Sequence, residues 1–128
     1  MKDLSERQFS DLIYETLEKL NYNEVLSNPT TESKYPLLEL HSPLKSVNKT
    51  IKGQAVYSRF QISITCWNAK TRECMEMVDE VDTCLQKLNI VRTNITPSMY
   101  DSILQKYNRT ATYEVDYNAL LGSFNLIK

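Results

Sequence analysis

The sequence is poor in glycine and histidine, and each shortage argues against a class of site. Two glycines in 128 residues cannot supply the G-x-x-x-x-G-K loop or the G-x-G-x-x-G turn, whose backbones cradle phosphate groups. His41 is the only histidine, so a zinc site would have to combine it with thiols at no recognised spacing. The sequence therefore favours neither a nucleotide-binding enzyme nor a zinc enzyme, and we expect no cofactor.

The three cysteines are odd in number and contain no C-x-x-C pair. This pattern indicates reduced thiols that are buried as small apolar side chains, not a disulfide framework. Cys74 and Cys84 are expected on one helix, where a rise of 1.5 Å per residue places them roughly 15 Å apart, too far for a disulfide.

Long apolar runs and an excess of one charge are also lacking. Basic and acidic residues number 15 and 16, so no net field attracts the chain to nucleic acid or to an anionic membrane. No run approaches the roughly 18 apolar residues of a membrane span, and the first ten residues lack the apolar core of a signal peptide. We therefore expect a cytoplasmic protein with no membrane partner.

A helix is expected to begin after Ser5. Ser5 and Gln8 have the spacing of a capping box, and Leu4 and Phe9 have that of a hydrophobic staple. Apolar residues then recur at the helical period, namely Phe9, Leu12, Ile13, Leu17 and Leu20. This periodicity predicts one buried helix face.

Residues 37–41 are expected to form a strand, which Pro43 ends. Residues 42–54 have no clean period and contain Gly53. They also carry three lysines, Lys45, Lys49 and Lys52. We expect a long, flexible hairpin loop here.

Strict alternation over residues 55–67 predicts a long strand with one core face. The core face carries Val56, Phe60, Ile62, Ile64 and Cys66, and the other face carries Tyr57, Arg59, Gln61, Ser63, Thr65 and Trp67. From Asn68 or Thr71, both competent N-caps, the period becomes helical, with a stripe of Cys74, Met77, Val78, Val81, Leu85 and Leu88. This second helix is expected to pack on the sheet.

Two more strands are expected in "IVRTNITP" and "TATYEVDYNA". Residues 98–108 between them fit either a helical turn or an extended crossover. The expected order is α-β-β-α-β-β in a single α+β domain covering residues 1–128. Its sheet is expected to be antiparallel or mixed, with about four to five strands and two helices packed on it.

Two groups of residues have a chemical and a structural interpretation. The second helix carries the acids Glu73, Glu76, Asp79, Glu80 and Asp82, which could do acid–base work if they were buried together. They face away from the apolar stripe, which favours a solvated face near a helix N-terminus. Eight tyrosines could stack on single-stranded nucleic acid, but strand and interface packing is favoured because Glu114 and Asp116 would repel phosphate.

The strand face opposite the core combines aromatic residues with arginine, through Tyr57, Arg59, Gln61 and Trp67. That composition is typical of protein–protein contact surfaces. These residues are therefore explained most simply by a protein that functions by assembling with other proteins and has no enzyme activity.

Three segments together resemble a known family. They are "YPLLELHSP", "GQAVYSRFQISITCWNAKTRECMEMVDEVDTCL" and "YNRTATYEVDYNALLGSF". In order, these resemble the tail terminator or tail-completion proteins of long-tailed bacteriophages. The likeness covers residues 35–124, although residues 98–108 match only loosely.

The resemblance implies a small α+β subunit without enzyme activity. Such subunits form a ring, commonly a hexamer, that caps the finished tail tube and joins it to the head. The free strand face and the loop with Lys45, Lys49 and Lys52 would then meet neighbouring subunits. The partners would be the major tail-tube protein and head–tail connector proteins, with DNA at most passing through the ring. The protein would be found in the host cytoplasm during assembly and then in the virion. A head–tail connector, a nucleic-acid-binding module and a small enzyme remain alternatives.

Overall fold

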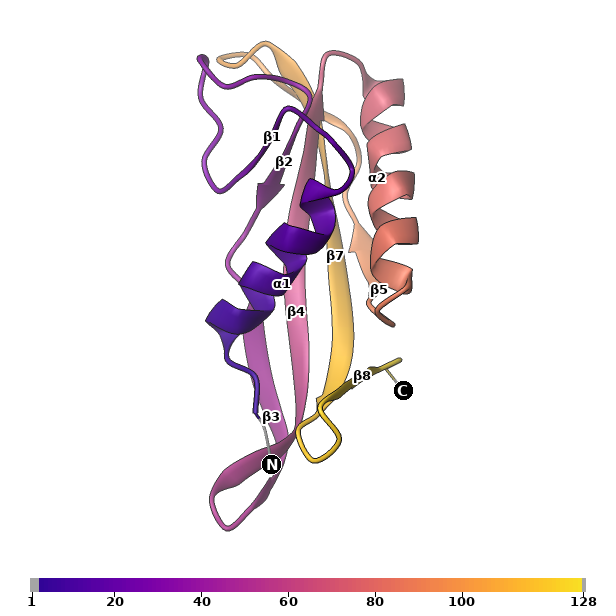
Figure 1. The fold of residues 1–128 in the computed structure, drawn as a ribbon. Helices are drawn as coiled ribbons and strands as arrows, with labels where there is room; N and C mark the ends of the chain where they lie inside the picture. Colours follow the sequence, from indigo (N-terminus) through magenta and orange to yellow (C-terminus); the bar gives the residue numbers. More distant parts are fainter. Residues whose placement is uncertain (1–2, 128) are drawn as a thin grey trace.

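The computed structural model describes residues 3–127, in which two helices cover one face of a long mixed sheet (Figure 1). The elements, in chain order, are α1 (Glu6–Glu18), β1 (Glu24–Leu26), β2 (Leu37–Leu40), β3 (Leu44–Ile51), β4 (Gln54–Asn68), α2 (Thr71–Gln86), β5 (Val91–Ile95), β6 (Met99–Asp101), β7 (Lys106–Asn118) and β8 (Ser123–Asn125). The α+β class expected from the sequence is confirmed. Within residues 3–127 the sheet has eight strands, so the expectation of four to five strands and of the order α-β-β-α-β-β is wrong.

The long antiparallel pair of β4 and β7 forms the centre of the sheet, with Tyr57 opposite Asn118 at one end and Asn68 opposite Tyr107 at the other. The edge of β4 that faces away from β7 pairs with β3 along the first half of β4 and with β2 along the second half. The edge of β7 that faces away from β4 pairs with β6, β5 and β8. Only β1, which runs parallel to β2, makes the described sheet mixed.

The core lies between the helices and the face of the sheet that alternation predicted. On β4 it contains Phe60, Ile62, Ile64 and Cys66, and on β7 it contains Ala111, Tyr113, Val115 and Tyr117. The helices contribute Phe9, Ile13, Leu17, Met77, Val78, Val81 and Leu85. The rings of Phe9 and Phe60 stack with their centroids 4.5 Å apart, which joins α1 to β4.

All three cysteines are free thiols, as expected, and Cys74 and Cys84 lie on α2. Burial raises the pKa of the Cys66 thiol and of the Cys74 thiol. Both thiols therefore stay protonated near neutral pH and pack as apolar groups.

The two helices begin in different ways. At α1 the predicted capping box is present, because Ser5 Oγ accepts from the Gln8 N–H and Gln8 Oε1 accepts from the Ser5 N–H. The N-cap of α2 is Lys70, whose side chain makes no capping hydrogen bond, so the expectation of Asn68 or Thr71 is wrong. Asn68 still belongs to β4, and its side-chain oxygen accepts from the Ala69 N–H instead.

The segment 42–54 is a strand and a tight turn, not the long loop that the sequence led us to expect. Lys52 and Gly53 have φ angles of 54° and 79°, which suit the positive φ that a two-residue hairpin turn requires at both positions. A register shift between Val47 and Lys49 leaves Asn48 without a partner across the ladder. This bulge interrupts the alternation and explains why no clean period is visible.

The hairpin formed by β3 and β4 projects past the N-terminal start of α1, at the bottom of Figure 1. We call its outer part, residues 46–58, the arm. Residues 98–108, for which the sequence fitted either a helical turn or an extended crossover, contain β6, a turn and the start of β7. In that turn Asp101 Oδ1 accepts from the N–H groups of Ile103 and Leu104.

Candidate interaction surfaces

The sheet face opposite the helices carries a ladder of polar pairs between β4 and β7. Arg59 binds Asp116 through two contacts, Nε to Oδ1 at 2.8 Å and a terminal nitrogen to Oδ2 at 3.2 Å. Further along, the hydroxyl oxygens of Ser63 and Thr112 are 3.0 Å apart, and those of Thr65 and Thr110 are 2.8 Å apart. The side chains of this face therefore hold one another in place across the strands.

Four of the residues predicted at a subunit interface lie together at the arm end of this face. Tyr57 is 39% exposed, its hydroxyl accepts from Asn118 Nδ2, and the Lys49 ammonium lies 5.9 Å from its ring centroid. Arg59 follows along β4, and its hydrogen bond to Asp116 raises the pKa of the guanidinium. Gln61 lies opposite Glu114 on the same face.

Trp67 is not an exposed member of that surface. It lies at the other end of β4, is only 7% exposed, and donates its indole N–H to Glu39 Oε1 at 2.9 Å. The ring of Tyr35 packs edge-on against it, at a centroid distance of 6.3 Å. Trp67 was expected to be buried by a neighbouring subunit, but the segment before β2 already buries it within its own subunit.

The three lysines predicted to act together occupy three different environments. Lys45 lies on the helix side, where its ammonium binds Asp3 Oδ2 and the Leu4 carbonyl, both at 2.7 Å. Lys49 lies over Tyr57 on the opposite side, and Lys52 occupies the turn of the arm. Lys45 therefore fastens the start of the chain to the sheet, while Lys49 and Lys52 remain available on the arm.

Sequence reasoning missed a set of exposed apolar side chains, which fall into three groups. The arm end has Leu44, Val47, Ile51, Leu120 and Leu121, the β6–β7 end has Met99, Tyr100 and Ile103, and the helix side has Tyr14 and Met75. Leu121 and Ile103 are 76% and 80% exposed. The sequence feature that could have revealed these exposed side chains is the presence of apolar residues inside turn-forming segments, as in "ALLGSF" and "SMYDSIL".

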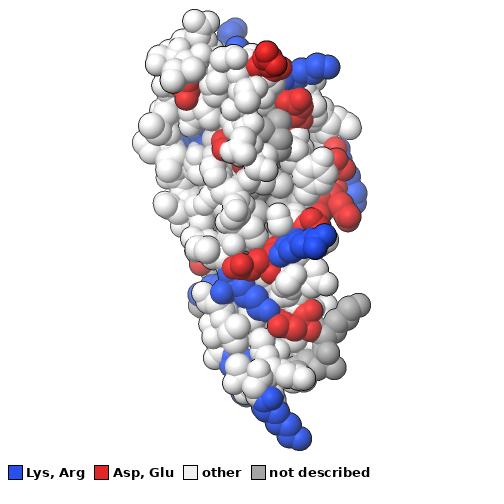
Figure 2. Space-filling view, turned by 90° about the vertical axis from the view of Figure 1, so that its left-hand side faces the viewer, with Lys and Arg blue, Asp and Glu red and all other residues white. Residues whose placement is uncertain are grey.

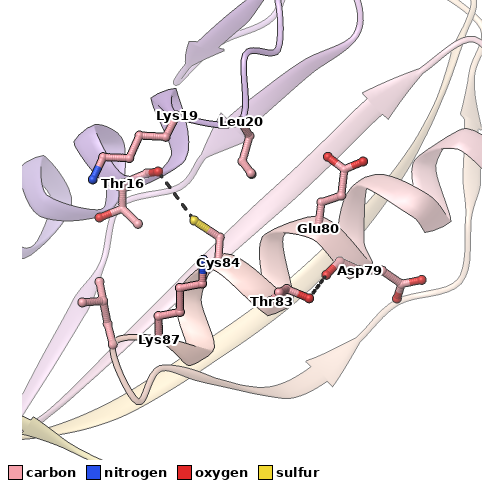
Figure 3. Close-up of a pocket in the computed structure, with 9 residues that line it drawn as sticks. Thr16, Lys19, Leu20, Asp79, Glu80, Thr83, Cys84 and Lys87 are labelled. Atoms are coloured by element: carbon pink, nitrogen blue, oxygen red, sulfur yellow. Dashed lines mark hydrogen bonds between the residues drawn. The ribbon is translucent and has the colours of Figure 1, made fainter.

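A groove runs between α1 and α2, with a cavity volume of about 630 Å³. Leu20, Cys84 and Leu88 supply apolar lining, and the Cys84 thiol donates to the Thr16 carbonyl. Figure 3 shows Asp79 and Glu80 toward one end of the groove and Lys19 and Lys87 toward the other. The groove is thus apolar along its length, with charges of opposite sign at its two ends.

Charges of both signs are interspersed on the face shown in Figure 2, and basic side chains lie at its lower end. No group of three or more His, Cys, Asp or Glu side chains within residues 3–127 is placed to hold a metal ion. None of the helices in the described part of the chain has the length and apolarity to span a membrane. Comparison with models of known protein families gives no match, and neither does comparison with curated proteins.

Proposed function

We propose that the chain is a virion structural protein that forms a ring, commonly a hexamer, which caps the tail tube and joins it to the head. The observation that carries this proposal is that exposed apolar side chains gather at the arm end and at the β6–β7 end, on separate parts of a subunit whose own core is already formed. Separate apolar patches on one small subunit are the usual mark of several protein contacts.

The shape of the subunit supports the same function. The 15 residues of β4 span roughly 50 Å at about 3.3 Å per residue, with the arm end at one extreme and the β6–β7 end near the other. A ring subunit needs two different surfaces for its two neighbours, because the contact is head to tail. It needs further surfaces for the tail-tube protein below and the connector protein above.

Within this proposal, the surface of Tyr57, Arg59 and Gln61 contributes to subunit contacts together with Lys49 and Lys52. Trp67 and Lys45 stabilise the subunit itself. DNA at most passes through the lumen, and the ring assembles in the host cytoplasm before it becomes part of the virion. This role is inferred from the resemblance to tail terminator proteins, and the exposed surfaces provide the contacts that assembly requires.

The test is to delete the gene from its phage and to examine the lysate by electron microscopy. Tails of uncontrolled length, unattached to filled heads, are the expected result. A plasmid copy of the wild-type gene should restore normal particles, which controls for effects on neighbouring genes. Heads that leak DNA beside tails of normal length would move the assignment to a head–tail connector. Normal infectious particles would rule out a structural role.

A matched pair of plasmid variants links the phenotype to the exposed surfaces. Ile103→Asp places a charge on an apolar side chain at the β6–β7 end and should fail to restore particles while the purified subunit stays folded. Ser102→Asp, at an exposed position in the same turn, is the control and should restore them.

A further inference from the structure

The outer edge of β3 carries backbone groups that no other strand of the described sheet pairs with. Within residues 3–127, β4 is the only strand that pairs with β3. The register from Leu44 to Val47 is regular, and in such an antiparallel ladder every second residue points its N–H and C=O away from the partner strand. The N–H of Lys45 points outward, because it donates to a side chain of α1. The N–H and C=O of Val47, two positions on, therefore point outward as well.

The start of α1 covers one part of this edge. Glu6 Oε2 accepts from the Lys45 N–H at 2.8 Å. The Lys45 ammonium binds Asp3 Oδ2 and the Leu4 carbonyl, both at 2.7 Å, and the Lys45 side chain is only 15% exposed. Figure 1 shows the start of α1 beside β3. Two carboxylates from one short segment therefore hold a single edge residue of β3.

The next part of the edge is open. Val47 is 50% exposed on the helix side, where it pairs with Ser58, and Leu44 is 61% exposed on the other face, where it pairs with Gln61. Asp3, Lys45 and Val47 line one hollow with a volume of about 490 Å³, so the covered and the open parts of the edge lie side by side. An open edge with exposed apolar side chains on both faces is a surface to which a further strand can add.

We propose that the start of α1 is an autoinhibitory latch on the open edge of β3. While Glu6 and Asp3 hold Lys45, a further strand cannot reach the outward N–H of that residue. Once the latch is released, the β3 edge pairs with the β3 edge of a second copy of this chain. The inference does not rest on the ring of the proposed function.

The symmetry of the edge explains why the occupant is a second copy. In an antiparallel register centred on Ser46, Lys45 of each copy lies opposite Val47 of the other, and each of these pairs exchanges two backbone hydrogen bonds. Four such bonds then join two identical edges. The pairing stops beyond Val47, because the bulge at Asn48 interrupts the strand. The latch and the pairing need the same N–H group, so each excludes the other.

Removal of the latch tests the inference. The released variant carries Asp3→Ala and Glu6→Ala and keeps the capping box of Ser5 and Gln8. It should self-associate about tenfold or more tightly than the wild type, because four backbone hydrogen bonds become available to a second copy. Sedimentation velocity measures the association, and circular dichroism checks the fold. If the released variant loses its fold, Asp3→Asn with Glu6→Gln replaces it in the same comparison.

Two further variants separate the edge from other surfaces. Asp11→Ala with Glu15→Ala removes two acids from exposed positions of the same helix. It is the matched control and should associate as the wild type does. Val47→Pro, added to the released variant, removes an outward N–H without removing a hydrogen bond to β4, and should return association to the wild-type level. If the proline disrupts the fold, Val47→Lys replaces it, because pairing would then bring two ammonium groups opposite each other.

Each remaining outcome overturns the inference. A released variant that associates as the wild type does would show that the latch guards nothing. Association that survives Val47→Pro would place the contact on another surface. In dilute protein the Lys45 amide should exchange its hydrogen faster in the released variant, and unchanged exchange would show that Glu6 does not cover it. The deletion phenotype in the phage is measured separately, so these results leave the proposed function to its own test.

Discussion

The indole N–H of Trp67 donates a hydrogen bond of 2.9 Å to Oε1 of Glu39 on the neighbouring strand. The two residues lie diagonally across the β2–β4 ladder, where Glu39 faces Thr65 and Trp67 faces Leu37. Leu37 is fully buried although it lies on the sheet face away from the helices. Trp67, Tyr35 and Leu37 thus form a small apolar cluster at one end of that face, outside the main core.

Trp67→Ala should therefore destabilise the free subunit by about 3 to 5 kcal/mol, because it removes a buried aromatic ring and leaves the Glu39 carboxylate without its donor. Urea unfolding of the wild type and the variant measures the difference. Trp67→Phe keeps most of the apolar volume but not the donor, and should cost less. A folded Trp67→Ala subunit of normal stability that fails only in assembly would restore the interface role.

The two faces of β4 should respond differently to truncation. Ile62→Ala empties a site in the main core and should cost about 2 to 5 kcal/mol. Thr65→Ala should cost about 1 to 3 kcal/mol, because Thr65 is only 3% exposed and its hydroxyl lies 2.8 Å from both His41 Nε2 and Thr110 Oγ1. Denaturant titration compares the two, and a larger loss for Thr65→Ala would contradict the assignment of the core face.

Alkaline pH should destabilise the fold through Tyr113. Its burial and its hydrogen bond to Asp82 raise the pKa of this phenol from the ordinary 10.0. Tyr113 stays protonated in the folded state while the unfolded chain loses the proton above about pH 10. Its contribution to stability is therefore fully present below pH 10 and is lost as the pH rises further.

Tyr113→Phe should accordingly flatten the alkaline fall in the free energy of unfolding, by up to about 1.4 kcal/mol per pH unit. Urea titrations at pH 8 and at pH 11 measure this slope for both proteins. Tyr100→Phe, at an exposed position, is the control and should leave the slope unchanged. Equal slopes for the wild type and Tyr113→Phe would show that the raised pKa plays no part.

The turn of the arm should depend on Gly53. Its φ of 79° is a conformation that other residues rarely adopt, although open space surrounds the position where a Cβ would lie. Gly53→Ala should therefore loosen the hairpin by about 1 kcal/mol through backbone strain, without a steric clash. Faster amide hydrogen exchange in β3, with unchanged exchange in α2, is the expected measurement. Slow exchange in β3 of the wild type would also exclude the flexible loop predicted from the sequence.

The parts of the fold that the sequence predicted correctly are those with a sustained period. Alternation from Val56 to Cys66 and the helical stripe from Cys74 to Leu85 each place several residues on one face, so the burial pattern can be read without knowing the partner. The capping box of Ser5 and Gln8 was equally predictable, because both of its hydrogen bonds form between residues three positions apart. The strands β1, β6 and β8 have only three residues each, which is too short for a period.

The candidate surfaces were less predictable than the core. Alternation correctly placed Tyr57, Arg59 and Trp67 on the face away from the helices, but it carried no information on what covers that face. Tyr35 and Glu39 cover Trp67 from segments that are distant along the chain, whereas Tyr57 near the end of the sheet stays partly open. The side of a strand on which a residue lies follows from its position in the local alternation. Whether that residue is exposed depends on which distant segments cover it.

The sequence by itself determined the two helices, the central strands and the core face, because their side-chain periods are repeated over many residues and hydrophobic burial follows the period. Only the tertiary structure decided where β3 pairs and how the bulge at Asn48 divides the β3 side chains between two faces. It also decided that Lys49 and Lys52 lie on the arm while Lys45 binds the start of the chain. It also decided that Trp67 is buried within the subunit and that Ile51 and Ile103 are not. These outcomes depend on contacts between segments far apart in the chain, and no local pattern of residues encodes such contacts.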